Sequence, residues 1–231
     1  MENYKNVTHC LFDMDGLLLD TEDRYTMAFN EVLSKYGSDK IFGWNEKSSV
    51  MGLQWRQSCQ FIIDKYSLPL TPEELADQLT PVYEKLFPQS QLLPGAERLL
   101  RHLYKHKIPI ALATSSSAAS YELKTKQVKP IFELFHHQVL GGSDPDVKNG
   151  KPAPDIFLVA ASRFSDNPEP SKCLVFEDAP NGVQAAVSAG MQVVMVPDSN
   201  LPKDLTKKAT KVIGTLLEFK PEEFGLPPFD D

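Results

Sequence analysis

Apolar and polar positions follow two different patterns along this chain. Between residues 22 and 88 the apolar residues recur at a spacing of three or four, and no strand pattern interrupts them. This stretch predicts helices over residues 22–36, 55–66 and 72–86. We expect Thr21 to cap the first of these helices, and Thr71, followed by a proline and two acids, to cap the third. The first pattern therefore predicts an all-helical block.

From residue 93 onward, short apolar runs alternate with helical patterns. Strands are predicted over 108–113, 138–140, 172–176, 192–196 and 211–213, and helices over 96–106, 118–127, 154–163 and 180–189. One more strand, Thr8 to Phe12, precedes the helical block. Strands that alternate with helices through short loops form a parallel sheet with helices on both faces. We therefore expect an α/β core formed by residues 1–19 and 90–231, with an inserted all-helical domain formed by residues 20–89.

Composition and charge narrow the class of protein. The chain has 231 residues, of which 42% are hydrophobic and 24% are charged, enough for one large core and a smaller second domain. The net charge of −7 and the absence of a Lys/Arg-rich run disfavour a nucleic-acid polymer or an anionic membrane as partner. The start of the chain is polar, and no apolar run approaches a membrane span. Three cysteines far apart in the sequence predict buried free thiols and a reducing compartment, so we expect a cytoplasmic protein.

The first predicted strand ends in the sequence DMDG. Side chains two apart along a strand point the same way, so Asp13 and Asp15 should emerge together, and Gly16 lets the backbone turn away. Two carboxylates held close together repel, and a shared proton, a cation or both must stabilise them. The alternative is a simple acidic turn, because Asp and Gly are common turn residues.

Other polar residues follow the remaining strands. Thr114, Ser115 and Ser116 end one strand, Glu177 and Asp178 end another, and Lys151 lies in the loop before a helix. In parallel sheets, ligands bind beyond the carboxyl ends of the strands. Carboxylates suit Mg²⁺, and the hydroxyls and N–H groups of a helix start suit an anion, so together these groups predict a site for phosphate.

Each of these features also has a plain structural interpretation. The serine cluster, Thr114 to Ser117, is by itself typical of a helix cap. Lys151 alone is typical of a solvated loop, and Glu177 with Asp178 of a charge pair at a helix start. We assign Asp155 to helix capping. His102 and His106, one helical turn apart, suit either a metal or, as we favour, a solvated helix face.

Four motifs in this order resemble those of the haloacid-dehalogenase superfamily of aspartate-nucleophile phosphotransferases. They are DMDG at 13–16, ATSS at 113–116, GKPAPD at 150–155 and FEDAPNG at 176–182, and AAVSAGM at 185–191 fits the same branch. The resemblance covers nearly the whole chain and is to the β-phosphoglucomutase-like branch. It implies a Rossmann-like parallel α/β core with an inserted helical cap, and Mg²⁺ as the cofactor.

The resemblance also implies roles for individual residues. Asp13 would be the nucleophile, and Asp15 the acid and base. The metal would lie on Asp13, Asp178 and the Asp15 carbonyl, with Glu177 supporting it from outside. Lys151 would hold the phosphoryl oxygens. The residues implied to bind phosphate with it are Thr114, Ser115 and Ser116.

The second aspartate favours a phosphatase or a phosphomutase over a dehalogenase, because a dehalogenase has no leaving alkoxide to protonate. Specificity is expected in the cap, at Gly52, Gln54, Arg56 and Tyr25, with Trp55 or Phe61 stacking on a base. Related mutases carry a histidine where this chain has Tyr25, which favours hydrolysis.

The expected partner is a small phosphorylated metabolite, a nucleoside or sugar monophosphate, and the expected state is a monomer or weak dimer. A phosphomutase and a catalytically silent binding protein remain the alternatives.

Overall fold

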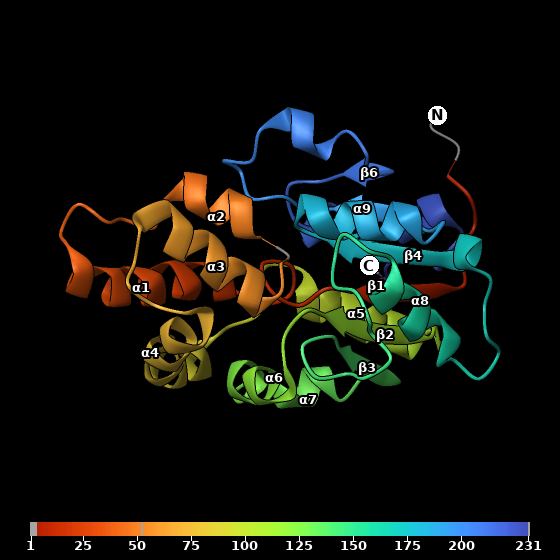
Figure 1. The fold of residues 1–231 in the computed structure, drawn as a ribbon. Helices are drawn as coiled ribbons and strands as arrows, with labels where there is room; N and C mark the ends of the chain where they lie inside the picture. Colours follow the sequence, from red (N-terminus) through yellow and green to blue (C-terminus); the bar gives the residue numbers. More distant parts are fainter. Residues whose placement is uncertain (1–3, 52, 231) are drawn as a thin grey trace.

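Six parallel strands form one sheet in the order β3-β2-β1-β4-β5-β6 (Figure 1). The computed structural model describes residues 4–51 and 53–230. The strands are β1 His9–Phe12, β2 Ile110–Thr114, β3 His137–Leu140, β4 Cys173–Glu177, β5 Gln192–Met195 and β6 Lys211–Val212. This confirms the predicted parallel sheet, with β1 at its centre between β2 and β4.

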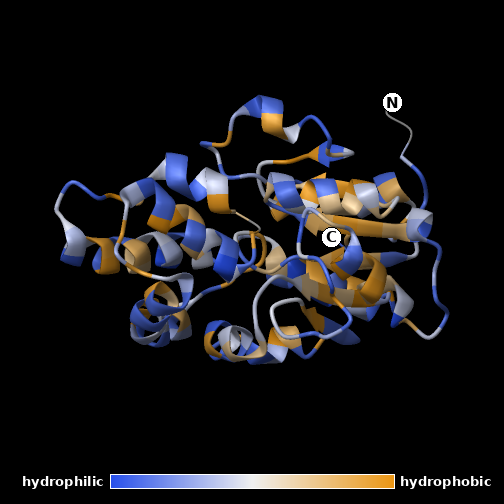
Figure 2. Ribbon diagram, in the orientation of Figure 1, coloured by the Kyte–Doolittle hydropathy of each residue, from blue (hydrophilic) through white to orange (hydrophobic). Residues whose placement is uncertain are grey.

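Helices cover both faces of the sheet. Alternate residues of a strand point to opposite faces, so Phe12 packs on one face and Leu11 on the other. The face of Phe12 is covered by α5 Ala96–Lys105, α7 Lys129–Phe132 and the C-terminal segment. The opposite face is covered by α8 Asp155–Ser162 and α9 Pro180–Ser188. Figure 2 shows these strands as largely hydrophobic, as expected for a sheet buried on both sides.

A second helical group lies beyond the carboxyl ends of the strands. It contains α1 Thr21–Leu33, α2 Trp44–Val50, α3 Trp55–Tyr66 and α4 Pro72–Leu86, to the left of the sheet in Figure 1. These helices enclose a separate cluster of buried residues, built from Phe29, Ile62, Leu75 and their neighbours. We propose that residues 20–89 form a cap domain, and that residues 1–19 and 90–231 form the core domain.

Two adjacent chain segments connect these parts. Leu19 bridges Leu92, and the Asp20 N–H donates to the Gln91 carbonyl at 3.1 Å. The Asp20 carboxylate in turn accepts from the Gln91 N–H at 2.7 Å. The entry to the helical group therefore lies beside its exit.

Helix ends differ in part from the predictions. Thr71 caps α4 as predicted, accepting from the Glu74 N–H at 3.2 Å. Thr21 does not cap α1: it is the first helical residue and its hydroxyl bonds Asp15 instead. Asp155 does not cap α8 either, because its carboxylate accepts from the Asn149 N–H at 2.9 Å and fixes the preceding loop.

Two short helices were not predicted from the sequence. The buried residues of α2 are Glu46 and Lys47, so no apolar periodicity marks it. The four-residue α7 is too short for a periodic pattern. Helix α6 Ala118–Thr125, in contrast, was predicted. It belongs to the core side and lies next to the cap.

Cys10, Cys59 and Cys173 are buried free thiols, as predicted. No helix among the described residues is both long and apolar enough to cross a membrane.

Candidate active site

Three neighbouring strands bring the predicted residues to one edge of the sheet. Asp13 directly follows β1, Thr114 is the last residue of β2, and Glu177 is the last residue of β4. The Asp13 N–H donates to the Phe176 carbonyl at 3.0 Å, so the pairing of β1 and β4 continues into the site. The strands are parallel, and their carboxyl ends therefore meet at this edge.

Lys151 reaches the same edge from the loop between β3 and α8. Its Nζ lies 2.5 Å from Asp13 Oδ1, 2.7 Å from Glu177 Oε1 and 3.2 Å from the Ala113 carbonyl oxygen. Burial by itself lowers the pKa of Lys151, but the carboxylates of Asp13 and Glu177 outweigh it and raise that pKa. Lys151 is therefore a buried cation beside Asp13, and the two carboxylates favour its charged form.

Three buried acids surround one point of this edge. Carboxylate oxygens of Asp13, Glu177 and Asp178 lie within 4.8 Å of one another. Burial raises the pKa of Asp13 to about 7; Lys151 opposes this, and repulsion from Glu177 adds to it. Burial and then repulsion from Glu177 and Asp13 also raise the pKa of Asp178 well above its usual range. When ionised, the three acids carry more negative charge than Lys151 offsets, and their oxygen donors fit a hard divalent cation such as Mg²⁺.

Two glycines allow these acids to approach. Gly16 has φ +75°, and a Cβ there would lie 2.4 Å from Asp178 Oδ2. A Cβ on Gly182 would lie 1.7 Å from Glu177 Oε1. Glu177 Oε2 accepts from the N–H groups of Asp178 at 3.0 Å and Ala179 at 3.1 Å. Since Lys151 bonds its other oxygen, Glu177 is held on both sides by the protein.

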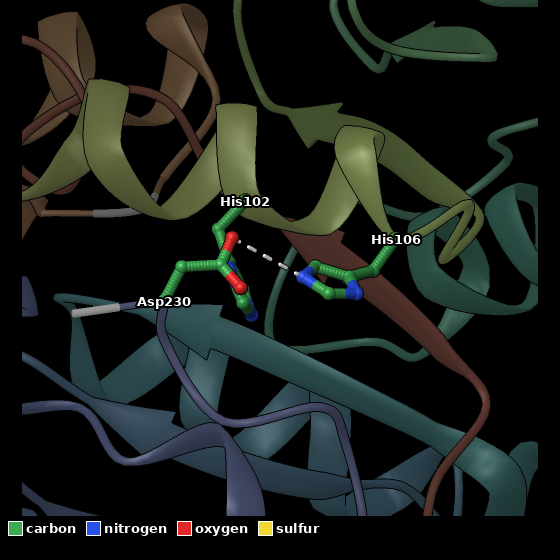
Figure 3. A group of neighbouring side chains, drawn as sticks. All are labelled: His102, His106 and Asp230. Atoms are coloured by element: carbon green, nitrogen blue, oxygen red, sulfur yellow. Dashed lines mark ion pairs between the residues drawn. The ribbon is translucent and has the colours of Figure 1, made fainter.

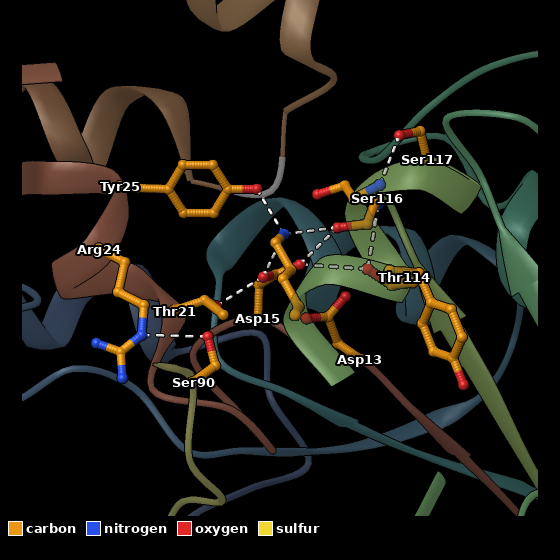
Figure 4. A network of polar contacts seen from close by, with 12 residues as sticks. Asp13, Asp15, Thr21, Arg24, Tyr25, Ser90, Thr114, Ser116 and Ser117 are labelled. Atoms are coloured by element: carbon orange, nitrogen blue, oxygen red, sulfur yellow. Dashed lines mark hydrogen bonds and ion pairs between the residues drawn. The ribbon is translucent and has the colours of Figure 1, made fainter. Parts of the chain in front are cut away.

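Asp15 lies in a separate network on the cap side of Asp13 (Figure 4). Its Oδ1 accepts from Thr21 Oγ1 and Lys124 Nζ, both at 2.6 Å, and its Oδ2 accepts from Ser116 Oγ at 2.9 Å and Thr114 Oγ1 at 3.4 Å. Burial acts to raise the pKa of Asp15, but the charge of Lys124 and these hydrogen bonds outweigh it and lower that pKa. Asp13 and Asp15, two residues apart, therefore lie in opposite electrostatic surroundings.

The residues of the serine cluster after β2 make two kinds of contact: one caps α6, and two bond Asp15. Ser117 caps α6 by accepting from the Ser120 N–H at 3.3 Å, which confirms the capping interpretation for this residue. The Ser116 N–H donates to Thr114 Oγ1 at 3.1 Å, and both hydroxyls bond Asp15. Ser115 lines the cavity between core and cap. Phosphate binding by Thr114, Ser115 and Ser116 stays a prediction.

A cavity of about 400 Å³ lies between the acids and the cap. Its floor includes Asp13, Asp15 and Asp178. Its cap side is largely apolar and aromatic, with Tyr25, Phe29, Phe42, Trp55, Tyr83 and Phe87. Pockets that bury small-molecule ligands commonly measure about 300–1,000 Å³. The cavity is therefore large enough for a small metabolite over the acids.

The residues predicted to set specificity lie in different places. Tyr25 lines the cavity. Gln54 touches Gly150, the residue before Lys151, but is not among the lining residues. Arg56 is exposed and pairs with Glu73 at 2.5 Å, outside the cavity.

Gly52 lies outside the described residues. Of the two aromatic residues considered for base stacking, Trp55 lines the cavity and Phe61 packs against the buried cluster of the cap.

Three charged residues of the site were missed. Lys124 bonds Asp15, while Glu22 and Lys47 line the cavity and face each other at 3.6 Å. Lys47 also lies 3.5 Å from Asp198 and over the Trp44 ring. None of these residues belongs to a motif, and a charged residue in an amphipathic helix is most often solvated, so the sequence carries no signal for them.

A second cluster of possible ligands lies far from this site. Ring nitrogens of His102 and His106 and an oxygen of Asp230 lie within 4.8 Å of one another (Figure 3). The interpretation of these histidines as a solvated face is wrong for His102, which is buried and bonds the Pro227 carbonyl through Nε2 at 2.9 Å. Asp230 also pairs with Lys105 at 2.6 Å. These contacts anchor the C-terminal segment on α5.

Comparison with known proteins agrees with this geometry. A family model described as haloacid dehalogenase-like hydrolase matches residues 7–190. A probable pseudouridine-5′-phosphatase of Drosophila melanogaster is 57% identical over 98% of this chain and 97% of its own length. The mitochondrial (DL)-glycerol-3-phosphatase 1 of Arabidopsis thaliana is 48% identical over 98% of this chain and 76% of its own. The crystal structure of a β-phosphoglucomutase from Clostridium difficile has a TM-score of 0.77 at 27% identity and covers 94% of each chain.

The chain belongs to the haloacid dehalogenase-like hydrolase family. Its Rossmann-like parallel sheet is the fold of that family, as the sequence predicted. Within the family it is a phosphoric monoester hydrolase.

Proposed function

We propose that this protein hydrolyses pseudouridine 5′-phosphate to pseudouridine and phosphate, through a phosphorylated Asp13 and with Mg²⁺. The observation that carries the chemistry is the contact of 2.5 Å between buried Lys151 and Asp13, beside two further acids and at the cavity of about 400 Å³. The substrate is supported by two relatives that are named as probable pseudouridine-5′-phosphatases. One, from Drosophila melanogaster, is 57% identical, and the other, from Saccharomyces cerevisiae, is 36% identical.

The residues of the site suit a two-step displacement. An oxygen of Asp13 attacks phosphorus, the bond from phosphorus to the leaving oxygen breaks, and the protonated form of Asp15 gives that oxygen a proton. Asp15 then takes a proton from a water whose oxygen attacks phosphorus, and the bond from phosphorus to the Asp13 oxygen breaks, which releases phosphate and restores the Asp13 carboxylate. Lys151 neutralises charge on the phosphoryl oxygens, with Ser116 among the groups that position them.

Asp13, Asp178 and the Asp15 carbonyl would hold Mg²⁺, with Glu177 supporting them. The ion would supply charge neutralisation for a phosphate that arrives beside carboxylates. The buried acid cluster, with its raised pKa values, supports this proposal.

Hydrolysis is favoured over a mutase reaction by the surroundings of Tyr25. Its hydroxyl accepts from Lys124 at 2.6 Å, and its ring packs edge-on against Tyr83 and Phe87. Related mutases carry a histidine at this position. This chain has instead a phenol group, which these contacts hold in place on the cap side.

A glycerol phosphate is the second candidate substrate, because a relative named as a glycerol-3-phosphatase is 48% identical. The cavity of about 400 Å³ with aromatic walls favours a larger alcohol that carries a planar ring. The cytoplasmic location and the monomer or weak-dimer state stay predictions from the sequence.

The test is phosphate release from a panel of esters with Mg²⁺ and, separately, with EDTA. We expect a kcat/KM for pseudouridine 5′-phosphate at least about tenfold above those for UMP, glycerol 3-phosphate and hexose phosphates, a difference of about 1.4 kcal/mol. EDTA should abolish release. Equal rates across the panel would reject the substrate, and isomerised sugar phosphate would indicate the mutase.

The nucleophile is tested by Asp13→Asn. We expect turnover to fall by more than about 10³-fold, because the amide cannot attack phosphorus, while the fold is kept. Wild-type protein quenched in acid should carry phosphate on Asp13 by mass spectrometry. Asp23→Asn, at an exposed position of α1, is the control and should keep full activity.

A further inference from the structure

We propose that Lys124, which lies outside the four motifs, is a positioning residue that holds the Asp15 carboxyl group and links it to the cap through Tyr25. The proposal rests on the proposed function, because it requires that Asp15 transfers the proton to the leaving oxygen.

Lys124 is buried, and its ammonium group bonds Asp15, Tyr25 and Ser116. It lies on α6 with an exposed fraction of 0%, and its Nζ donates to Asp15 Oδ1 at 2.6 Å, Tyr25 Oη at 2.6 Å and Ser116 Oγ at 2.8 Å. An ammonium group has three N–H donors, and all three are used. Removing a lysine from water is costly unless it is paired, so this burial is sustained by the carboxylate of Asp15.

Lys124 differs in kind from the other partners of Asp15. Thr21 and Ser116 donate neutral hydroxyl hydrogen bonds at 2.6 and 2.9 Å. Lys124 is the charged partner on Asp15 Oδ1, and a charge-assisted hydrogen bond is roughly twice as strong as a neutral one. It therefore fixes the direction of the Asp15 carboxyl group.

The same ammonium group connects the core to the cap. Its Nζ lies 4.7 Å from the ring centre of Tyr25 on α1, and 4.8 Å from that of Phe87, in η2 Phe87–Gln89 at the end of the helical group. These rings pack against each other with centroids 5.0 Å apart. Asp15 is thereby held by a residue whose own place depends on the cap being packed against α6.

This role predicts that loss of Lys124 lowers kcat/KM more for alkyl esters than for a nitrophenyl ester. When the bond from phosphorus to the leaving oxygen breaks, the electron pair goes to that oxygen, and an alkoxide needs the proton of Asp15 far more than a nitrophenolate does. Misplacing Asp15 should therefore slow alkyl esters selectively. The kcat/KM value reports this first step without the later hydrolysis of phosphorylated Asp13.

The test compares Lys124→Met with wild type on pseudouridine 5′-phosphate and on p-nitrophenyl phosphate. We expect kcat/KM to fall by about 100-fold or more for the nucleotide and by less than about 5-fold for the nitrophenyl ester. The matched control is Lys126→Met, two residues away and exposed, which should change neither value. An equal loss on both esters, or no loss on either, would overturn the proposal.

Two further measurements keep the test decisive. If Lys124→Met does not fold, Lys124→Gln retains N–H donors without the charge and should show the same selectivity at a smaller size. In an Asp15→Asn background, Lys124→Met should lower kcat/KM for the nucleotide by less than about twofold, because it acts through Asp15. A wild type that hydrolyses neither ester would instead reject the proposed function.

Discussion

Glu22 and Lys47 form a pair on the cavity wall, and in this position the pKa of Glu22 differs from its usual value. They face each other at 3.6 Å on the cavity wall, with Lys47 nearly buried and the Glu22 side chain 23% exposed. Burial raises the pKa of Glu22 to about 7; Lys47 opposes this, and repulsion from Asp15 adds to it. The cavity therefore carries an acid whose charge changes near neutral pH.

This residue gives a pH dependence of stability with a defined sign. The folded-state pKa of Glu22 lies above its ordinary 4.5, so its contribution to stability is present below pH 4.5 and is lost as pH rises through about 7. Asp13 and Asp178 act in the same direction. In EDTA, we expect the Tm of wild type to fall between pH 5 and 8, and that of Glu22→Gln to fall less. Glu133→Gln, at an exposed position, should follow wild type. A Glu22→Gln curve parallel to that of wild type would contradict this account.

At the scale of elements, the loop between β3 and α8 decides where Lys151 lies. Arg163, after the last turn of α8, donates to both carboxylate oxygens of Asp144 at 2.6 and 2.8 Å, and to Asp146 at 2.8 Å. Asp155 holds Asn149 in the same loop. The loop is thus fixed at two points before it delivers its lysine to the sheet edge.

Removing the first of these contacts tests the role of the loop. We expect Arg163→Met to lower stability by roughly 1 kcal/mol, or about 2–4 °C in Tm, because a bidentate pair that is partly exposed is lost. Amide exchange should quicken in residues 141–150, and kcat should fall several-fold as Lys151 becomes less well placed. Arg101→Met, which loses an exposed pair with Glu97 on α5, is the control and should leave kcat unchanged. An unchanged exchange rate in the loop would show that Arg163 does not hold it.

At the scale of the whole molecule, the buried apolar side chains of residues 4–51 and 53–230 fall into three clusters. Two lie on opposite faces of the sheet, and the third, around Ile62, lies within the helical group and shares no residue with them. The two parts meet at the paired segments near Leu19 and Leu92 and across the cavity. The cap therefore has a core of its own to stabilise it.

This separation predicts that a truncation in the cap core and one in the sheet core raise amide exchange in different regions of the chain. Ile62→Ala should cost about 2–5 kcal/mol and raise amide exchange chiefly in residues 21–86, while Val175→Ala, about 1–3 kcal/mol, should raise it across the sheet. Exchange measured by mass spectrometry on both variants distinguishes the regions. A uniform rise after Ile62→Ala would mean that core and cap unfold as one unit.

Much of the core site was predictable because its chemistry is local in sequence. Asp13 and Asp15 are two apart after a strand, and Thr114 and Glu177 end the neighbouring strands, so a parallel sheet brings them together whatever its details. Lys124 was not predictable, because two of its three partners, Tyr25 and Asp15, are 99 and 109 residues away and its helix gives no sign of which face is buried.

The sequence by itself determined the alternation of strands and helices, the helical insertion and the residues at the strand ends, because these depend on periodicity and on neighbours along the chain. Only the tertiary structure decided which charges are buried. Glu22, Lys47 and Lys124 are charged residues with no local signal of burial, and the packing of the cap over the sheet edge buries Lys47 and Lys124 and partly buries Glu22. Burial and pairing depend on distances between segments far apart in the chain, which no local pattern encodes.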